Sequence, residues 1–131
     1  MKPVDAASLV IVRNRCEVLM GLRSSRHVFV PQQYVFPGGR VDAGDARVPT
    51  PFALTDPVQQ RLGRSLTVAR SRGTAMAAVR ETWEETGLLL ARPLETPLRT
   101  RSPGWKAFYR QGLAPALDRV SYFARAITPP N

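Results

Sequence analysis

The most acidic stretch of the chain covers residues 80–90, RETWEETGLLL, and holds Glu81, Glu84 and Glu85 within five residues. The chain as a whole is basic, with 19 Lys and Arg residues against 10 Asp and Glu residues. Like charges three or four residues apart on a helix destabilise it by about 0.2–0.5 kcal/mol per pair. Two interpretations remain open at this point: an acidic helix face in contact with solvent, or a binding site for a divalent cation such as Mg²⁺, which takes oxygen ligands.

These carboxylates need a helix to carry them, and the sequence predicts one over residues 74–86. Thr74 can cap its N-terminus, and Gly87 can end it in the left-handed conformation that suits glycine. Advancing about 100° per residue places the three glutamates on one face. A separate face is an apolar stripe of Met76, Val79 and Trp83. We therefore expect the stripe to pack on the core and the glutamates to point away from it.

A second segment upstream, residues 34–45 with the sequence YVFPGGRVDAGD, interrupts a strand pattern with glycines. Gly38 and Gly39 follow a proline, which indicates that the backbone turns tightly there or comes close to another group. Residues 34–36 and 40–42 are predicted as short strands on either side.

The remaining chain predicts short elements and one insertion. The other predicted elements are strands at 7–13, 17–23, 88–91 and 117–127, a hairpin turn at Asn14 and Arg15, a short helix at 57–62 and a helical turn at 105–110. Residues 46–73 hold few large apolar side chains, so we interpret them as an insertion between two structured segments.

Length and composition indicate one folded domain, because the chain has 131 residues of which 44% are hydrophobic. The net charge of +9 favours anionic partners, although arginine-rich usage can also reflect genome composition alone. The single cysteine, Cys16, allows no intrachain disulfide. The apolar run at the N-terminus is too short for a signal peptide or a membrane span, so we expect a cytoplasmic protein without a membrane partner.

The glycine segment and the acidic helix together resemble the Nudix box, the signature of the Nudix hydrolase superfamily with its MutT-like pyrophosphatases. The box runs Gly, five residues, Glu, seven residues, Arg-Glu, an aliphatic residue, any residue, Glu-Glu, any residue, Gly and an aliphatic residue. Gly39 opens it here, and Asp45 stands at its first acidic position. The second half is matched, at the expected mutual spacing, by Arg80, Glu81, Glu84, Glu85, Gly87 and Leu88.

Three features depart from this pattern. Asp45 is shorter than Glu but still permits a water-mediated or helix-capping role, and Thr82 stands where an aliphatic residue is usual. Residues 46–79 put 34 residues between Asp45 and Arg80 where the pattern has seven, so 27 are extra. Because loop-closure entropy grows only logarithmically with loop length, the helix can still dock on the two glycines. A box split in this way resembles that of the coenzyme A diphosphatase branch.

The resemblance implies Mg²⁺- or Mn²⁺-dependent hydrolysis of a nucleoside diphosphate linked to another moiety, which the branch resemblance narrows to coenzyme A or acyl-CoA. It implies Glu84 and Glu85 as principal metal ligands and the carbonyl of Gly38 as a further ligand. Glu81 would be a ligand or the general base, and Arg80 would hold Glu81 through a charge-assisted hydrogen bond. Arg80 and the three glutamates are therefore the expected catalytic residues.

Basic residues near the box could hold the phosphate groups of the substrate. The candidates are Arg23, Arg26 and Arg40. Two other functions stay open: a Nudix scaffold that binds a nucleotide without catalysis, and a charge-driven nucleic-acid binder. The intact box glutamates disfavour the first alternative. Local support for the second is limited to aromatic residues around Lys106, which are more typical of packing.

The resemblance also implies the fold, a single α+β domain over residues 1–131 built as an α/β/α sandwich with a mixed β-sheet. Without the 27 extra residues the 131-residue chain is short for the whole sandwich, so we expect the C-terminal part of the fold to be absent. A sheet cut short in this way has an open edge, which self-association into a homodimer would cover.

Overall fold

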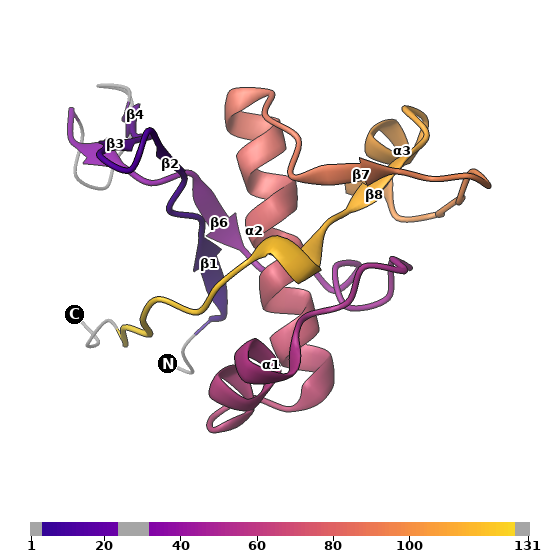
Figure 1. Ribbon diagram of the computed structural model, residues 1–131, viewed down its shortest axis with the longest axis horizontal. Helices are drawn as coiled ribbons and strands as arrows, with labels where there is room; N and C mark the ends of the chain where they lie inside the picture. The colour runs from indigo at the N-terminus through magenta and orange to yellow at the C-terminus, as the bar shows by residue number, and fades with distance from the viewer. Residues whose placement is uncertain (1–3, 24–31, 128–131) are drawn as a thin grey trace.

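A computed structural model describes residues 4–23 and 32–127 of the chain. The described residues form an α+β fold, as predicted, with one long helix through its middle (Figure 1). The elements nearest this helix are α2 (Val68–Thr86), β1 (Ala6–Ser8), β6 (Gly38–Arg40), β7 (Ala91–Pro93), β8 (Leu113–Pro115) and α3 (Pro103–Tyr109). The β1–β6 ladder lies on one side of α2, and β7, β8 and α3 lie on the other. In this part of the chain, no helix combines the length and apolarity that crossing a membrane requires.

Helix α2 begins six residues before the predicted start. Thr67 is its N-cap and accepts a hydrogen bond on its hydroxyl from the backbone N–H of Arg70 (3.3 Å). Thr74, the predicted cap, instead donates its hydroxyl to the carbonyl of Arg70 (2.8 Å) inside the helix. Gly87 ends the helix with φ of 75°, which confirms the predicted left-handed C-cap.

Gly73, the last residue of the predicted insertion, lies inside α2 instead. Its missing side chain leaves room for the loop after β6, because a Cβ at Gly73 would lie 3.3 Å from the Cβ of Ala46. Only part of the predicted insertion at 46–73 is therefore a connection: it contains α1 (Asp56–Gly63), which confirms the predicted short helix, and the first turns of α2.

The two box glycines lie in strand β6 and not in a tight turn. Strand β6 pairs antiparallel with β1, with Ser8 opposite Gly38 and Ala7 opposite Gly39. Neither glycine has a positive φ. A Cβ at Gly38 would collide with the carbonyl oxygen of Ala7 and would lie 2.6 Å from the Cα of Ser8. The predicted turn is therefore wrong, whereas the alternative prediction, close backbone approach, is confirmed.

The strands of the described residues pair as four separate two-stranded antiparallel ladders, and not as the one mixed sheet that was expected. Besides β1–β6 and β7–β8, these are β2 (Val12–Arg13) with β3 (Glu17–Val18), and β4 (Gly21–Leu22) with β5 (Tyr34–Val35). Asn14 and Arg15 have φ of 52° and 64°, which confirms the predicted hairpin turn between β2 and β3. These hairpins project away from α2 (Figure 1).

The core lies between α2 and α3, where the predicted apolar stripe meets aromatic side chains. Met76 and Val79 are fully buried, as are Trp105 and Phe108 of α3. The ring of Phe108 contacts those of Trp83 (5.4 Å between centroids) and Trp105 (5.1 Å) edge to face. Helix α3 confirms the predicted helical turn near residues 105–110.

The last predicted strand, residues 117–127, is wrong. The segment begins with a 3-10 turn, Leu117–Arg119, and forms no strand over residues 120–127. A strand needs a neighbour to satisfy its backbone groups, and each ladder of the described residues stops at two strands. The alternating pattern consequently faces no core, and Phe123 is 85% exposed. The strand predicted at 88–91 begins three residues later, as β7, and shares only Ala91 with the prediction.

Candidate functional site

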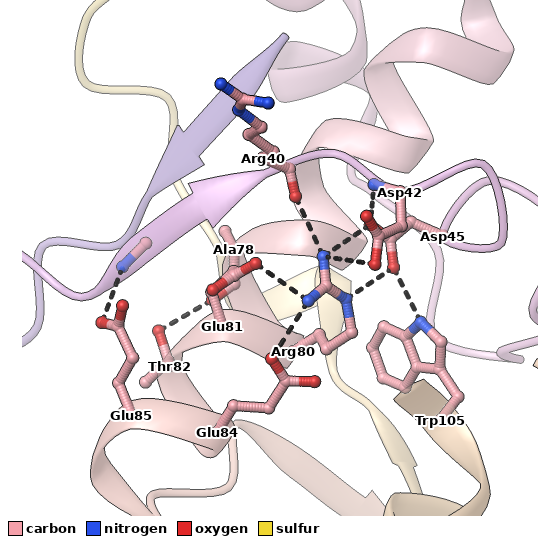
Figure 2. Close-up of polar contacts among 11 residues, drawn as sticks. Arg40, Asp42, Asp45, Ala78, Arg80, Glu81, Thr82, Glu84, Glu85 and Trp105 are labelled. Atoms are coloured by element: carbon pink, nitrogen blue, oxygen red, sulfur yellow. Dashed lines mark hydrogen bonds and ion pairs between the residues drawn. The ribbon is translucent and has the colours of Figure 1, made fainter. Parts of the chain in front are cut away.

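Arg80, on the middle of α2, is buried at the centre of the candidate site and is only 3% exposed. Its guanidinium donates hydrogen bonds to Asp45 Oδ1 (2.9 Å) and Oδ2 (3.1 Å), Glu81 Oε1 (2.9 Å), Glu84 Oε2 (3.1 Å) and the carbonyl oxygen of Arg40 (2.9 Å) (Figure 2). Burial alone would lower the pKa of Arg80, but the hydrogen bonds and charges of Asp45 and Glu81 outweigh burial and raise it. Arg80 therefore stays cationic and fixes the carboxylates around it.

Asp45 is the fully buried partner of Arg80 and comes from the loop after β6. It accepts both guanidinium hydrogen bonds side by side, a further bond from the indole N–H of Trp105 (2.8 Å), and one from the backbone N–H of Asp42 (2.8 Å). These four bonds occupy the carboxylate, so Asp45 orients Arg80 and is not available to a ligand. The shorter side chain at this box position thus has a defined structural role.

Glu81 and Glu84 are held next to each other by one guanidinium nitrogen of Arg80, Nη1. Glu81 also lies against Gly39 of β6, where a Cβ would meet its Oε2 at 2.5 Å and its Oε1 at 2.6 Å. The pKa of Glu84 is raised because burial disfavours its charged form, and this effect outweighs the attraction of Arg80. Glu81 and Glu84 therefore share one cation, and Glu81 lies directly against the glycine strand.

Glu85 also contacts strand β6, at Gly38, the residue before the Gly39 that Glu81 meets. Its Oε2 accepts a hydrogen bond from the backbone N–H of Gly38 (3.2 Å), as Figure 2 shows at the left of the network. Glu81 and Glu85 thus both point from α2 toward β6, and each meets one of the two box glycines. The two halves of the split box are joined in space although 40 residues separate Gly39 from Arg80.

Thr82, at the position where an aliphatic residue was expected, is buried. Its hydroxyl donates to the carbonyl of Ala78 one turn earlier (2.7 Å), so no polar group is left unsatisfied there. The departure at this position therefore does not disturb the helix face that carries the glutamates.

The charge of the cluster suits a divalent cation. Four carboxylates surround the guanidinium of Arg80, namely Asp42, Asp45, Glu81 and Glu84. Glu85, the next carboxylate of α2, bonds to the backbone N–H of Gly38 instead. Carboxylate and carbonyl oxygens are the donors that Mg²⁺ and Mn²⁺ prefer. Among the described residues no three carboxylates form a ready cluster around one point, since Arg80 lies between them. Mg²⁺ usually needs only one or two protein carboxylates beside water and phosphate, so the donor chemistry fits.

The two predicted phosphate-binding arginines that the structure describes, Arg23 and Arg40, do not direct their side chains to this network. Arg40 contributes its backbone carbonyl to Arg80, while its side chain points away from the carboxylates (Figure 2). Arg23 directly follows β4, on the hairpins that project from α2, and its backbone pairs with Gln33. Arg26 lies outside the described residues.

The contribution of Trp105 and Gly104 was not predicted from the sequence. Trp105 lies 60 residues from the Asp45 that it contacts, within a proline-rich stretch, and was interpreted as a packing residue. It is buried as expected, but its indole N–H also anchors the network. Gly104 packs on Arg80, since a Cβ there would lie 3.2 Å from Arg80 Cδ. No local spacing rule connects either residue with the box.

Comparison with known proteins gives one informative likeness. No protein-family model matches the chain. The structure is similar to the crystal structure of a NUDIX hydrolase from Alicyclobacillus acidocaldarius, with a TM-score of 0.68 and 28% sequence identity. The match covers 98% of this chain and 64% of that chain, so this chain spans less than two thirds of its neighbour's length. The likeness agrees with the α+β Nudix fold and supports the Nudix resemblance at the level of the superfamily.

Proposed function

We propose that the chain is a Nudix-type pyrophosphohydrolase that depends on Mg²⁺ or Mn²⁺ and cleaves the diphosphate of a nucleoside diphosphate linked to another moiety. One observation carries this proposal: Glu81 and Glu85 of α2 each meet one of the two glycines of β6, and the buried Arg80 holds Glu84 beside Glu81. A solvated acidic helix face does not account for this arrangement, because Glu81 lies against Gly39 and the exposed Glu85 still bonds to the backbone of Gly38 across the gap between α2 and β6.

In this proposal Glu81, Glu84 and Glu85, with the backbone carbonyl of Gly38, hold the metal ion. The ion neutralises the diphosphate and activates the attacking water when it is bound. The absence of a side chain at Gly38 and Gly39 lets α2 carboxylates and substrate approach the strand closely. Glu81 is the ligand or the general base, consistent with its position against β6.

Arg80 and Asp45 position these groups and do not touch substrate. Arg80 is almost fully buried, and its Nη1 fixes the spacing between Glu81 and Glu84. Asp45 fixes the guanidinium through two parallel hydrogen bonds, a geometry that restricts its rotation. The moiety beyond the diphosphate is proposed to be coenzyme A or acyl-CoA, on the resemblance of the split box to that branch.

The alternative function is a Nudix scaffold that binds a nucleotide without catalysis. It is favoured by the bridging position of Arg80, because the described residues show no group of three carboxylates ready to surround a metal. The two functions differ in turnover, not in ligand class.

A turnover assay separates them. The protein is incubated with Mg²⁺ or Mn²⁺ and a panel of coenzyme A, ADP-ribose, dinucleoside polyphosphates and NADH, and monophosphate release is measured. The proposal expects metal-dependent release that Glu84→Gln abolishes. Glu17→Gln is the matched control, because Glu17 makes an exposed surface pair with Arg13 on the hairpins. Ligand binding without any turnover across the panel would favour the non-catalytic scaffold.

A further inference from the structure

A cavity of about 560 Å³ adjoins the Arg80 network, and none of the roles proposed above uses it. This volume lies within the range of about 300–1,000 Å³ that is usual for small-molecule sites. The cavity separates the loop after β6 from the segment that leads into α3. Its lining includes Asp42, Arg47, Thr100, Arg101, Ser102 and Gly104.

Two of these residues connect the cavity to the carboxylates. Asp42 lies 3.5 Å from Arg80, measured from Oδ2 to Nη2. Gly104 packs over the same guanidinium, and a Cβ there would also lie 3.7 Å from Glu84 Oε1. A ligand in the cavity would therefore lie next to Glu84, one of the proposed metal ligands.

The cavity carries two uncommitted positive charges. Arg47 and Arg101 are exposed, and within residues 4–23 and 32–127 neither makes an ion pair or a side-chain hydrogen bond. Between them, the hydroxyl of Thr100 accepts the backbone N–H of Ser102 (3.1 Å), which leaves its own proton free to donate. Two guanidinium groups and a hydroxyl donor form a lining suited to phosphate oxygens.

A second cavity, larger than the first at about 760 Å³, provides a contrast. It shares no residue with the Arg80 network, and its arginines are already engaged. Arg72 donates to the carbonyls of Ala46 (2.6 Å) and Val48, while Arg92 pairs with Asp118 (2.7 Å). An anion would have to break these contacts to bind there. The smaller cavity offers its charges without such a cost.

We infer that the cavity lined by Arg47 and Arg101 is the subsite for a phosphate group of the substrate, on the side of the diphosphate that extends beyond the metal. This assignment rests on the function proposed above and names the residues that hold the anion. It assigns the phosphate-binding role to arginines of the loop after β6 and the segment before α3. Across the site the charges would then alternate in sign: anionic carboxylates, the metal cation, the anionic phosphate and the cationic arginines. Each group attracts its neighbour in this order.

Binding of inorganic pyrophosphate, measured by isothermal titration calorimetry with and without Mg²⁺, tests the subsite without turnover. We expect wild-type binding in Mg²⁺, and a dissociation constant about tenfold higher in Arg47→Gln/Arg101→Gln, because charge-assisted hydrogen bonds to the anion are lost. The matched control is Arg64→Gln/Arg119→Gln, which removes the same charge from exposed arginines outside both cavities. We expect this control to change the constant by less than about twofold.

The inference is overturned if the wild type does not bind pyrophosphate, or if both double variants bind it equally well. Its failure differs from failure of the proposed function. A protein that binds pyrophosphate through these two arginines but hydrolyses nothing in the substrate panel contradicts the hydrolase and supports the subsite.

Discussion

Gly39 is the residue that sets how close Glu81 comes to strand β6. A Cβ at Gly39 would collide with the Glu81 carboxylate, the far end of a flexible side chain, whereas a Cβ at Gly38 would collide with backbone atoms of β1. The two glycines of the box therefore have different roles, although they are adjacent. Gly39 makes room for a functional group, and Gly38 makes room for the ladder.

We predict opposite effects for alanine at these positions. Gly39→Ala should fold with little change in melting temperature, because Glu81 can rotate away, but it should weaken Mn²⁺ binding. Gly38→Ala should lose about 1–3 kcal/mol of unfolding free energy, since overpacking must move the β1 backbone. Chemical denaturation and Mn²⁺ titration of both variants measure this. A Gly39→Ala protein with unchanged metal affinity would show that Glu81 need not lie against β6.

Trp105 is a positioning residue in this account, because its indole N–H fixes the carboxylate that orients Arg80. We predict that Trp105→Phe, which keeps an aromatic ring, lowers both stability and Mn²⁺ affinity. Phe108→Leu is the control, since Phe108 is equally buried and contacts Trp105 but makes no polar contact with the network. It should lower stability and leave metal affinity unchanged. Equal loss of affinity in both variants would mean that Trp105 acts only through packing.

At the scale of elements, α2 joins both halves of the molecule. Its carboxylates meet β6, its apolar stripe meets α3, and its first turn is tied to the chain before β1. There, Arg70 donates two hydrogen bonds to Asp5, each 2.8 Å long. The hydrogen bond from Arg70 lowers the pKa of Asp5, against a smaller opposing effect of burial. This pair fixes α2 relative to the β1–β6 ladder that it serves.

The lowered pKa of Asp5 makes part of the stability dependent on pH. A carboxyl with a depressed folded-state pKa stabilises the protein above its unfolded pKa, and this contribution is lost as pH falls through the folded value. We predict that Asp5→Asn is less stable than wild type at about pH 7 and that the difference disappears as the pH falls through the lowered pKa of Asp5. Thermal unfolding followed by circular dichroism across this range measures it. A difference that stays constant with pH would exclude an ionic contribution from Asp5.

The sequence predicted those elements that a short run of neighbouring residues specifies. Helix α2 and its end at Gly87 follow from periodicity and a C-cap glycine, and the hairpin turn at Asn14 follows from a residue type that tolerates positive φ. The start of α2 was missed because Thr74 was predicted as its cap, whereas Thr67 caps a helix that begins six residues before the predicted start. The strand at 117–127 was wrong because pairing depends on a neighbour, which a local pattern does not reveal.

The residues of the candidate site also fall into two groups: those that a local motif predicts and those that only the folded chain brings together. Three box glutamates and Arg80 follow from spacing along one helix, and the structure brings two of these glutamates, Glu81 and Glu85, to the predicted glycines. Trp105 and the cavity arginines Arg47 and Arg101 come from segments far apart in the chain. Their proximity depends on how α3 packs on α2, so no motif within one segment could indicate them.

At the scale of the whole molecule, a chain with a net charge of +9 concentrates four carboxylates around one buried arginine. Excess basic charge elsewhere favours the approach of anionic ligands, but the carboxylates themselves would repel a diphosphate. A divalent cation at the network resolves this conflict, since it attracts both. The central claim is therefore that the α2 glutamates and the β6 glycines together bind a divalent metal.

Mn²⁺ binding followed by electron paramagnetic resonance tests this claim most directly, because it needs neither substrate nor turnover. The account predicts saturable binding by the wild type and by Glu17→Gln, whose exposed glutamate lies on the hairpins. It predicts that Glu84→Gln weakens binding at least about tenfold, as expected when a ligand that neutralises the ion is lost. Equal Mn²⁺ affinity in all three proteins, or no binding by the wild type, would contradict it.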